Sequence, residues 1–590
     1  MKTKQKQKPA PRRTLSNLWF LLRPWWRHGK LYIALRLIIA LASTAGQVAI
    51  ITSPAAIIGA VVAEQPLSDV LAVAAVYFGA ILAFTIVSMA IPAVYTDWKG
   101  VYIEAAIHRE ILAQARLADF HHLDDPEYFN SFQIAVKEMS ETSMRALNTL
   151  HAFIDSLISL FAMIAVVSQA GAAIVGITLA GLAVTSFFEA RSNHAYAEIT
   201  PAVTPHDRAM SYARRAFSLK ANASDIRATR VGDAIFEKFD VAQVKRMSIY
   251  KRIYFKLNAL QAGGFIARHF TQLCVLVYVA YGLISGRIAD IGLYATLIAA
   301  ASEVSTMTGN AVYSALNLHR ITITGGQVRT FFEIKSNIET QTTGTPPPDG
   351  ALSLDLRGVS FTYPNADFRL KNLNISIAPG EKIAIVGENG AGKTTLSKLL
   401  LRLYDTGGGE ILYNGKSIRD YNIHALRRKI GVAFQDPQLY ALTVRENMCV
   451  YNKSDDATLR AVLKTVGLDL DLDAEVTREF DESGVMLSGG EAQKLGLSRL
   501  LHGDYGLLLL DEPSSALDPI AEYEMTKLMF DSSKTTTIMI AHRLSTIRAA
   551  DKIYLIADGE VAESGTHDEL MTLGGKYAEM FTKQAENYVK

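Results

Sequence analysis

Cysteine is nearly absent from this 590-residue sequence, which contains only Cys274 and Cys449. Two cysteines so far apart in the chain exclude a disulfide framework and a cysteine-rich metal site. Net charge is also small, because 60 Lys and Arg nearly balance 58 Asp and Glu and leave a formal charge of +2. Without a basic excess to bind a phosphate backbone, the composition predicts no nucleic-acid partner.

The N-terminal segment lacks the features of a cleaved targeting signal. It is basic and rich in Lys, but the apolar run that follows is broken by Arg23 and Pro24 and has no small-residue cleavage site. We interpret residues 1–30 as a cytoplasmic basic tail that ends in an interfacial helix. Residues 16–27 hold three Trp with flanking Arg, which suits the lipid headgroup region. A packed core helix is the alternative.

Long apolar runs, by contrast, fill the first half of the chain. Each of six runs can cross a hydrocarbon core of roughly 30 Å: 31–62, 70–96, 148–168, 171–189, 259–284 and 291–314. The tail through Lys30 and the segments 97–147 and 190–258 hold nine, five and thirteen Lys or Arg, whereas the short connections hold only Arg287. This asymmetry predicts that both termini are cytoplasmic. The long polar segments are expected to continue the helices into the cytoplasm.

Composition changes after the last apolar run. Residues 340–350, TQTTGTPPPDG, have the Thr, Gly and Pro content of an exposed linker. We therefore expect a six-helix membrane domain over 31–330, a linker over 331–351 and a second domain over 352–590. Strand-like runs alternate with helical patterns in this last part, which predicts an α/β domain.

Residues 387–395 read GENGAGKTT and lie between a strand-like and a helix-like apolar run. The spacing G-x-x-x-x-G-K-[ST] is satisfied by Gly387, Gly392, Lys393 and Thr394 and predicts a phosphate-binding loop. Glycines allow several backbone N–H groups to face one anion, the Lys reaches the outer phosphates, and the Thr hydroxyl can ligate Mg²⁺. The alternative is an ordinary turn between a strand and a helix.

Further elements of the second half point to the same chemistry. LLLLDE is an apolar strand that ends in Asp511 and Glu512, placed to hold Mg²⁺ through water and to face a γ-phosphate. Two acids at a buried strand end are costly unless they serve an ion. The segments FQDPQLY, LSGGE, SALD and AHRLST contain Gln435, Ser488, Asp518 and His542 in turn. Each segment alone is a weak signal.

Together and in this order, the segments resemble the ATP-binding cassette, and the whole chain looks like an exporter-type ABC half-transporter. The implied fold is a membrane α-helical domain of six transmembrane helices with long cytoplasmic extensions, followed by an α/β P-loop cassette. The LSGGE segment separates this family from kinases and small GTPases. The resemblance implies ATP and Mg²⁺ as cofactors.

The resemblance also implies roles for individual residues. Tyr363 would stack on adenine, and Gly387, Asn389, Gly390, Gly392, Lys393, Thr394 and Thr395 would cradle the phosphates. Thr394, Gln435 and Asp511 would hold Mg²⁺. Glu512, His542, Gln435 and Lys393 would act in hydrolysis. Ser488 and Gly490 would bind the γ-phosphate held by a second chain, and Gly489 and Asp518 would also belong to the nucleotide-binding residues.

Two segments depart from the family pattern. The fifth signature residue is Glu491, where Gln is commoner, and Ala492 and Lys494 follow it. Ser488 and both glycines are intact, so we expect a working site. Upstream, TREFDESGVM has Asp481 at the usual first glycine of a loop that faces the cytoplasmic helices in the family.

Because both sides of the implied site look competent, we expect a homodimer, with a heterodimer as the alternative. The resemblance implies coupling through two short cytoplasmic helices, which we place near 122–130 and 206–217. Ordinary solvated helix turns are the alternative at each place.

Ionisable residues inside the apolar runs bear on what is carried. A charged group at this depth should face protein or a water-filled cavity rather than lipid. We predict a polar, inward-opening cavity for an amphipathic or peptidic substrate, lined by Asp155, Arg268, His269 and Glu303. A structural ion pair, such as Arg268 with Glu303, is the alternative, and Glu189 is a fifth such residue.

The sequence therefore predicts an ATP-driven exporter that works by alternating access in a bacterial inner membrane, with a lipid bilayer around it and an unknown substrate. A lipid flippase, a siderophore importer with an exporter-like fold and an ATP-gated membrane protein are alternatives. A soluble cassette ATPase is excluded unless the six runs do not enter lipid.

Overall fold

The computed structural model describes residues 14–170, 172–219, 222–285, 291–363, 369–513, 517–531, 534–541 and 547–589. The chain divides into two compact units. Unit 1 comprises Met1–Arg116 with Glu127–Ile334, and unit 2 comprises Leu117–Pro126 with Lys335–Lys590. The segment predicted as a linker, 331–351, is thus split between the units.

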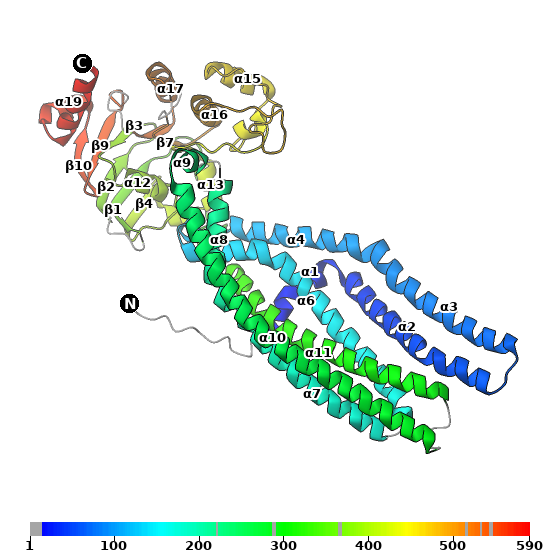
Figure 1. Cartoon of the computed structure of the whole chain (residues 1–590). Helices are drawn as coiled ribbons and strands as arrows, with labels where there is room; N and C mark the ends of the chain where they lie inside the picture. Colours follow the sequence, from blue (N-terminus) through cyan, green and yellow to red (C-terminus); the bar gives the residue numbers. More distant parts are fainter. Residues whose placement is uncertain are drawn as a thin grey trace. The chain divides into compact units, whose positions relative to one another are not determined.

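Unit 1 consists of helices among its described residues (Figure 1). In chain order they are α1 (Thr14–His28), α2 (Lys30–Val62), α3 (Leu67–Ile91), the π turn η2 (Pro92–Thr96), α4 (Asp97–Arg116), α6 (Pro126–Val167), η3 (Ser168–Ala170), α7 (Ala172–Ala197), α8 (Ile199–Ser218), α9 (Ala223–Ala228), α10 (Val231–Ile284) and α11 (Ile291–Phe332). The long helices run side by side, with α2 against α3 and α11, and α7 against α10 and α11. The π turn begins at Pro92, which has no N–H for the helical ladder.

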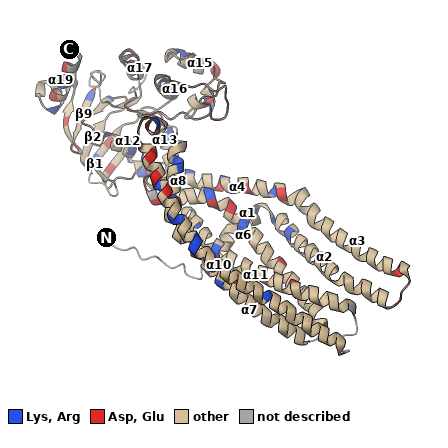
Figure 2. Cartoon of the chain, in the orientation of Figure 1, with Lys and Arg blue, Asp and Glu red and all other residues tan. Residues whose placement is uncertain are grey.

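Five described helices are long and apolar enough, by length and composition, to cross a membrane: Lys30–Val62, Leu67–Arg116, Glu127–Val167, Ala172–Tyr196 and Val231–Ile284. Each overlaps one of the first five predicted runs. The sixth run, 291–314, falls on α11, which is not among the five; Ser, Thr and Glu303 interrupt its apolar residues. The sixth span stays a prediction. In Figure 2 one half of α2, α3, α7 and α10 is almost free of charged residues.

The three tryptophans of helix α1 differ in their exposure. Trp25 is buried, and its Nε1 donates a hydrogen bond of 2.7 Å to Ser143 Oγ on α6. Trp19 and Trp26 are exposed. One Trp therefore anchors the helix to unit 1, and the interfacial position of the other two remains a prediction.

The second predicted short helix was placed wrongly. Residues 206–217 lie inside α8, and the short helix is α9, several residues further along the chain. One of the charged residues that suggested the end of a helical extension, Asp207, instead forms an ion pair with Arg246 of α10 at 2.8 Å. The first predicted position, 122–130, overlaps the end of α5 (Phe120–Leu123) and the start of α6.

Unit 2 contains two β-sheets. An antiparallel sheet has the order β2-β1-β4-β5, from Arg369–Ile377, Leu354–Thr362, Gly408–Tyr413 and Lys416–Ser417. The second sheet has the order β10-β9-β3-β8-β7-β6, from Glu560–Gly565, Lys552–Ala557, Lys382–Val386, Thr536–Ile540, Leu507–Asp511 and Ile430–Ala433. All neighbours in the second sheet are parallel except β10 and β9.

The larger sheet is buried on both faces, as its continuous apolar strands predict. Leu507 and Leu509 of β7 join a core shared with β1, β2 and the helix α12 (Lys393–Leu400). Leu508 and Leu510 face a second core. That core also includes residues of α14 (Val444–Met448), α15 (Asp456–Thr465), α16 (Gly489–Leu501), α17 (Pro519–Asp531), α18 (His567–Leu573) and α19 (Lys576–Val589). The turn η5 (Ile418–Asp420) and helix α13 (Ile423–Arg428) complete the unit.

Candidate functional site

The GENGAGKTT segment forms a tight loop between β3 and α12. Gly387 has φ +155°, and a Cβ on it would lie 2.2 Å from the carbonyl oxygen of Ile556. Gly392 has φ +105° and is the residue before α12. Only glycine fits both positions without strain, so the loop can direct its N–H groups to one side, where the N-terminus of α12 favours an anion.

Lys393 folds back over this loop. Its Nζ donates hydrogen bonds to the carbonyl oxygens of Gly387 at 2.8 Å and Glu388 at 3.0 Å, and the residue is only 5% exposed. Burial lowers the pKa of its ammonium, while Glu512 and Asp511 act in the opposite direction. The cation is therefore held at the loop in a place where a phosphate would compensate its burial.

Asp511, the last residue of β7, is buried beside the loop. Its Oδ2 accepts a hydrogen bond of 3.2 Å from Ser397 Oγ of α12. Its Oδ1 is buried and accepts no hydrogen bond from the residues that the structure describes. Burial raises the pKa of this carboxyl group, the Ser397 hydrogen bond lowers it, and the nearby Glu512 raises it. An unpartnered, buried carboxylate oxygen fits a hydrated Mg²⁺ ion.

Gln435 and Glu512 face each other, with Gln435 Nε2 donating to Glu512 Oε2 at 3.0 Å. Glu512 has φ +50°, a strained conformation for a residue with a side chain, and its N–H donates to Ile540 O of β8. Both residues line a cavity of about 570 Å³. Its other lining residues are Tyr363, Asn389, Gly390, Gly392, Lys393, Thr394 and Thr395.

Tyr363 stands in an aromatic cluster at this cavity. Its ring centroid lies 4.9 Å from that of Phe361 and 5.3 Å from that of Tyr404, both in edge-on geometry. Lys398 Nζ lies 5.7 Å from the Tyr363 centroid. These contacts hold the Tyr363 ring at the wall of the cavity.

The signature segment is built as a helix start. Ser488 precedes α16, its Oγ accepts from Glu491 N–H and donates to Glu491 Oε2 at 2.8 Å, and Ser488 N–H donates to the same carboxylate. This capping box explains why Glu suits the fifth position. These two hydrogen bonds from Ser488 lower the pKa of the Glu491 carboxyl group. The residues that line the cavity described above include none from this segment.

The sequence analysis also singled out Asp518, Asp481 and His542. Asp518 Oδ1 accepts the N–H groups of Ile520 and Ala521 at 3.0 Å and so caps α17. Asp481 closes its own turn by accepting the Ser483 N–H and hydroxyl. His542 lies outside the described residues.

The residues predicted to line a substrate cavity are not joined to one another. Within the described part of unit 1, no hydrogen bond or ion pair connects any two of Asp155, Arg268, His269 and Glu303. Arg268 Nη2 instead lies 3.9 Å from Glu189 Oε1, so the pairing with Glu303 considered above is wrong. Their role toward a substrate remains a prediction.

Sequence reasoning missed Ser397, which holds the Asp511 carboxylate. A signal was present, because Ser397 follows Lys393 by four residues and so lies on the same face of α12.

Comparisons with known proteins agree with this site. The family described as ABC transporter matches residues 370–515. The β-(1→2)glucan export ATP-binding/permease protein NdvA of Nitrobacter winogradskyi is 42% identical over 238 residues, which span 39% of this chain and 39% of that protein. The ATP-dependent lipid A-core flippase of Escherichia coli K12 is 35% identical over 238 residues, which span 39% of this chain and 41% of the flippase. The match thus spans about two fifths of these relatives.

A solved structure extends the likeness beyond the cassette. A bacterial Atm1-family ABC exporter with ATP bound aligns with a TM-score of 0.76 and 21% identity, over 94% of this chain and 98% of that chain. The fold is therefore that of an ABC exporter: a helical unit with several apolar helices and an α/β ATP-binding cassette. The match to the ABC transporter family itself covers residues 370–515 of the cassette.

Proposed function

We propose that this chain hydrolyses ATP at sites shared between two copies and uses the energy to move a substrate across a membrane by alternating access. The observation that carries the proposal is Asp511. Its buried Oδ1 has no hydrogen-bond partner among the described residues, and Asp511 directly precedes Glu512, which lines the cavity at the phosphate-binding loop together with Gln435 and the buried Lys393. No structural role for these costly burials is evident without a charged ligand.

The residues would divide the work as follows. Backbone N–H groups of the 387–395 loop and the Lys393 ammonium would bind the phosphates and oppose their charge in the transition state. Thr394, Gln435 and Asp511 would hold Mg²⁺, which would supply positive charge to neutralise the phosphates. Glu512 would orient the attacking water and accept its proton, with Gln435 fixing the carboxylate through their 3.0 Å hydrogen bond.

A second copy would complete each site. Ser488, Gly489 and Gly490 do not line the cavity that holds the other residues, so their implied contact with γ-phosphate requires a surface from elsewhere. A symmetric pair of chains supplies two such surfaces at once. We therefore favour a homodimer over a heterodimer. Two ATP molecules would close the cassettes, and hydrolysis would reopen them.

The relatives also suggest classes of transported substrate and a type of membrane. The relatives are named for export of a glucan and for flipping of lipid A-core, so amphipathic and glycan-bearing substrates join peptides as classes to test. A bacterial inner membrane fits the apolar helices and these relatives, with both termini and the cassette in the cytoplasm.

The test is ATP hydrolysis by the purified chain alone in lipid, beside the Glu512→Gln variant. The proposal predicts hydrolysis by the parent chain and its loss in the variant, with fluorescent ATP analogue still bound by both. Asp355→Asn, a change of the same kind at a carboxylate that accepts the Ser376 hydroxyl, serves as the control and should hydrolyse normally. A parent chain that binds ATP yet remains inactive would refute the homodimeric engine.

A further inference from the structure

The tip of the first helical hairpin, Leu117–Pro126, belongs to unit 2, although α4 before it and α6 after it belong to unit 1. Unit 2 resumes at Lys335, directly after α11. The chain therefore passes between the units at three points, two of which flank the tip while the third precedes residues 335–345, called here the linker segment. Any force between the units that travels along the covalent chain passes through the tip or the linker segment.

Asp119 joins the tip to the linker segment. Its side chain is almost fully buried, with the residue 1% exposed. Oδ2 accepts the N–H of Asn337 at 2.7 Å, and Oδ1 accepts those of Ile338 at 3.0 Å and Glu339 at 2.8 Å. The backbone N–H of Asp119 donates to Ser336 Oγ at 3.2 Å. Three N–H groups on one carboxylate satisfy its burial and form strong, charge-assisted hydrogen bonds.

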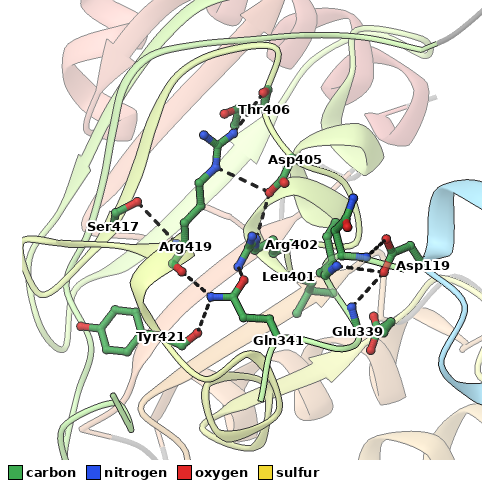
Figure 3. Close-up of polar contacts among 12 residues, drawn as sticks. Asp119, Glu339, Gln341, Leu401, Arg402, Asp405, Thr406, Ser417, Arg419 and Tyr421 are labelled. Atoms are coloured by element: carbon green, nitrogen blue, oxygen red, sulfur yellow. Dashed lines mark hydrogen bonds and ion pairs between the residues drawn. The ribbon is translucent and has the colours of Figure 1, made fainter. Parts of the chain in front are cut away.

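The linker segment is in turn fixed to the cassette (Figure 3). Arg427 Nη1 of α13 lies 2.6 Å from Glu339 Oε1 in an ion pair that is largely buried. Gln341 Oε1 accepts a hydrogen bond of 2.7 Å from Arg402 Nη1, and Gln341 Nε2 donates to the carbonyl oxygens of Arg419 and Tyr421. The linker segment thus lies on the cassette rather than hanging free between the units.

The tip has a second contact with the cassette. The Tyr404 hydroxyl donates to Asp124 Oδ2, and the Phe120 ring centroid lies 5.7 Å from that of Tyr404. Tyr404 also contacts Tyr363 at 5.3 Å, the residue placed to stack on adenine. Lys398 Nζ lies within 6 Å of all three ring centroids. The tip therefore touches the wall of the candidate nucleotide cavity through one intervening ring.

We propose that Asp119 is a positioning residue that fixes the first hairpin tip and the linker segment to the cassette of the same chain, so that every covalent route between the units moves with the cassette. We call this set of contacts, from Asp119 to residues 336–339 and from Glu339 and Gln341 to the cassette, the clamp. Its consequence for transport rests on the proposed function. Because the tip and the linker segment are tied together, movement of the cassette would displace the ends of α4, α6 and α11 in one step.

The chemistry of Asp119 allows a sharp substitution. Asn has the same shape, but its NH₂ group would face N–H donors where a carboxylate oxygen now accepts. Asp119→Asn should therefore weaken the clamp without creating a cavity. Glu339→Gln, which removes the charge opposite Arg427, provides a second variant that leaves Asp119 intact, and Asp355→Asn is the control on a remote strand.

The clamp is tested by hydrogen exchange and mass spectrometry on the full chain in lipid nanodiscs. Exchange of the amides of residues 336–340 should accelerate about tenfold or more in Asp119→Asn and remain unchanged in Asp355→Asn. Glu339→Gln should act in the same direction. Unaltered protection of β7 in each variant verifies that the cassette is folded. Unchanged exchange of 336–340 in a folded Asp119→Asn would overturn the clamp.

The consequence is tested with spin labels at Gln65→Cys in both copies, in a chain whose two native cysteines are replaced by Ala. In the parent, MgATP with vanadate should change the distance between the labels. Asp119→Asn should hydrolyse ATP within about twofold of the parent but lose this change in distance. If the variant responds as the parent does, positioning by Asp119 is refuted. If the parent itself does not respond, the proposed function fails, whereas the exchange experiment still decides the clamp.

Discussion

Replacing Asp511 by Asn should stabilise the cassette in the absence of nucleotide and remove its stabilisation by MgATP. The carboxylate is 2% exposed, and one of its oxygens has no partner among the described residues. Leaving a buried polar group unsatisfied costs about 1–3 kcal/mol, and more when it is charged. Asn removes the charge and still accepts the Ser397 hydroxyl, at a loss of about 1 kcal/mol for a weaker hydrogen bond, and its neutral NH₂ replaces the charged oxygen at the position without a partner. The net gain is about 1 kcal/mol, or roughly 2–4 °C for a unit of this size.

The two native cysteines make the assay specific. Cys449 lies in the cassette and Cys274 in α10, and both are free and partly exposed. In a Cys274→Ala background, a thiol-reactive fluorophore reports only on the unfolding of the cassette during heating. The same scan with MgATP should raise the midpoint of the parent and leave that of Asp511→Asn unchanged.

The pH dependence gives an independent check that Asp511→Asn raises, rather than lowers, the stability of the cassette. Burial raises the pKa of Asp511 above its ordinary value of 3.8, so the folded state binds the proton more tightly than the unfolded state. The destabilisation by this group is then absent below pH 3.8 and complete above the raised pKa. The advantage of Asp511→Asn should therefore shrink as pH falls through that window. A variant less stable than its parent at pH 7 without nucleotide would refute the reasoning.

Two other substitutions test the packing of the cassette and the shape of its phosphate-binding loop. Asn447→Ala should lower stability by about 1–3 kcal/mol, because the N–H of Tyr440 loses its Oδ1 acceptor and the carbonyl oxygen of Tyr440 loses its Nδ2 donor, whereas Arg499 keeps the carbonyl oxygens of Gln438 and residue 447; a heat-unfolding midpoint close to that of the parent would contradict this. Gly387→Ala should weaken binding of a fluorescent ATP analogue about tenfold or more, since its Cβ would lie 2.2 Å from Ile556 O. Unchanged affinity would show that the loop relaxes.

Features that depend on neighbours in sequence were predictable. The glycine spacing of the 387–395 segment predicted a loop that only glycine can form, and Gly387 and Gly392 have φ values that require it. The run LLLLDE predicted a buried strand because its four leucines fill both faces of a parallel sheet. In each case the physical cause lies within a few residues, so the pattern carries the information.

Features that depend on distant residues were not predictable. Asp119 is separated from its N–H partners by more than 200 residues, and its sequence context, ADFHH, is that of an ordinary helix cap. Likewise, the charges of 206–217 suggested a solvated tip, whereas Asp207 meets Arg246 across two packed helices. The pattern of charged residues in the sequence is the same whether their side chains contact water or a neighbouring helix.

Residues 340–350, which overlap the linker segment, show how composition misleads when hydrogen bonds are not considered. Thr, Gly and Pro predict an exposed and flexible connection over 340–350, yet Thr345 N–H donates to Asp420 O at 3.2 Å and Thr345 O accepts from Asn422 N–H at 3.0 Å. The composition instead suits a segment that is held against the cassette. The three prolines that follow Thr345 fix φ and add no N–H groups that need partners. Contacts at Glu339, Gln341 and Thr345 restrict the movement of this segment relative to the cassette. The contacts at Asp119 are therefore made to a segment already fixed on the cassette.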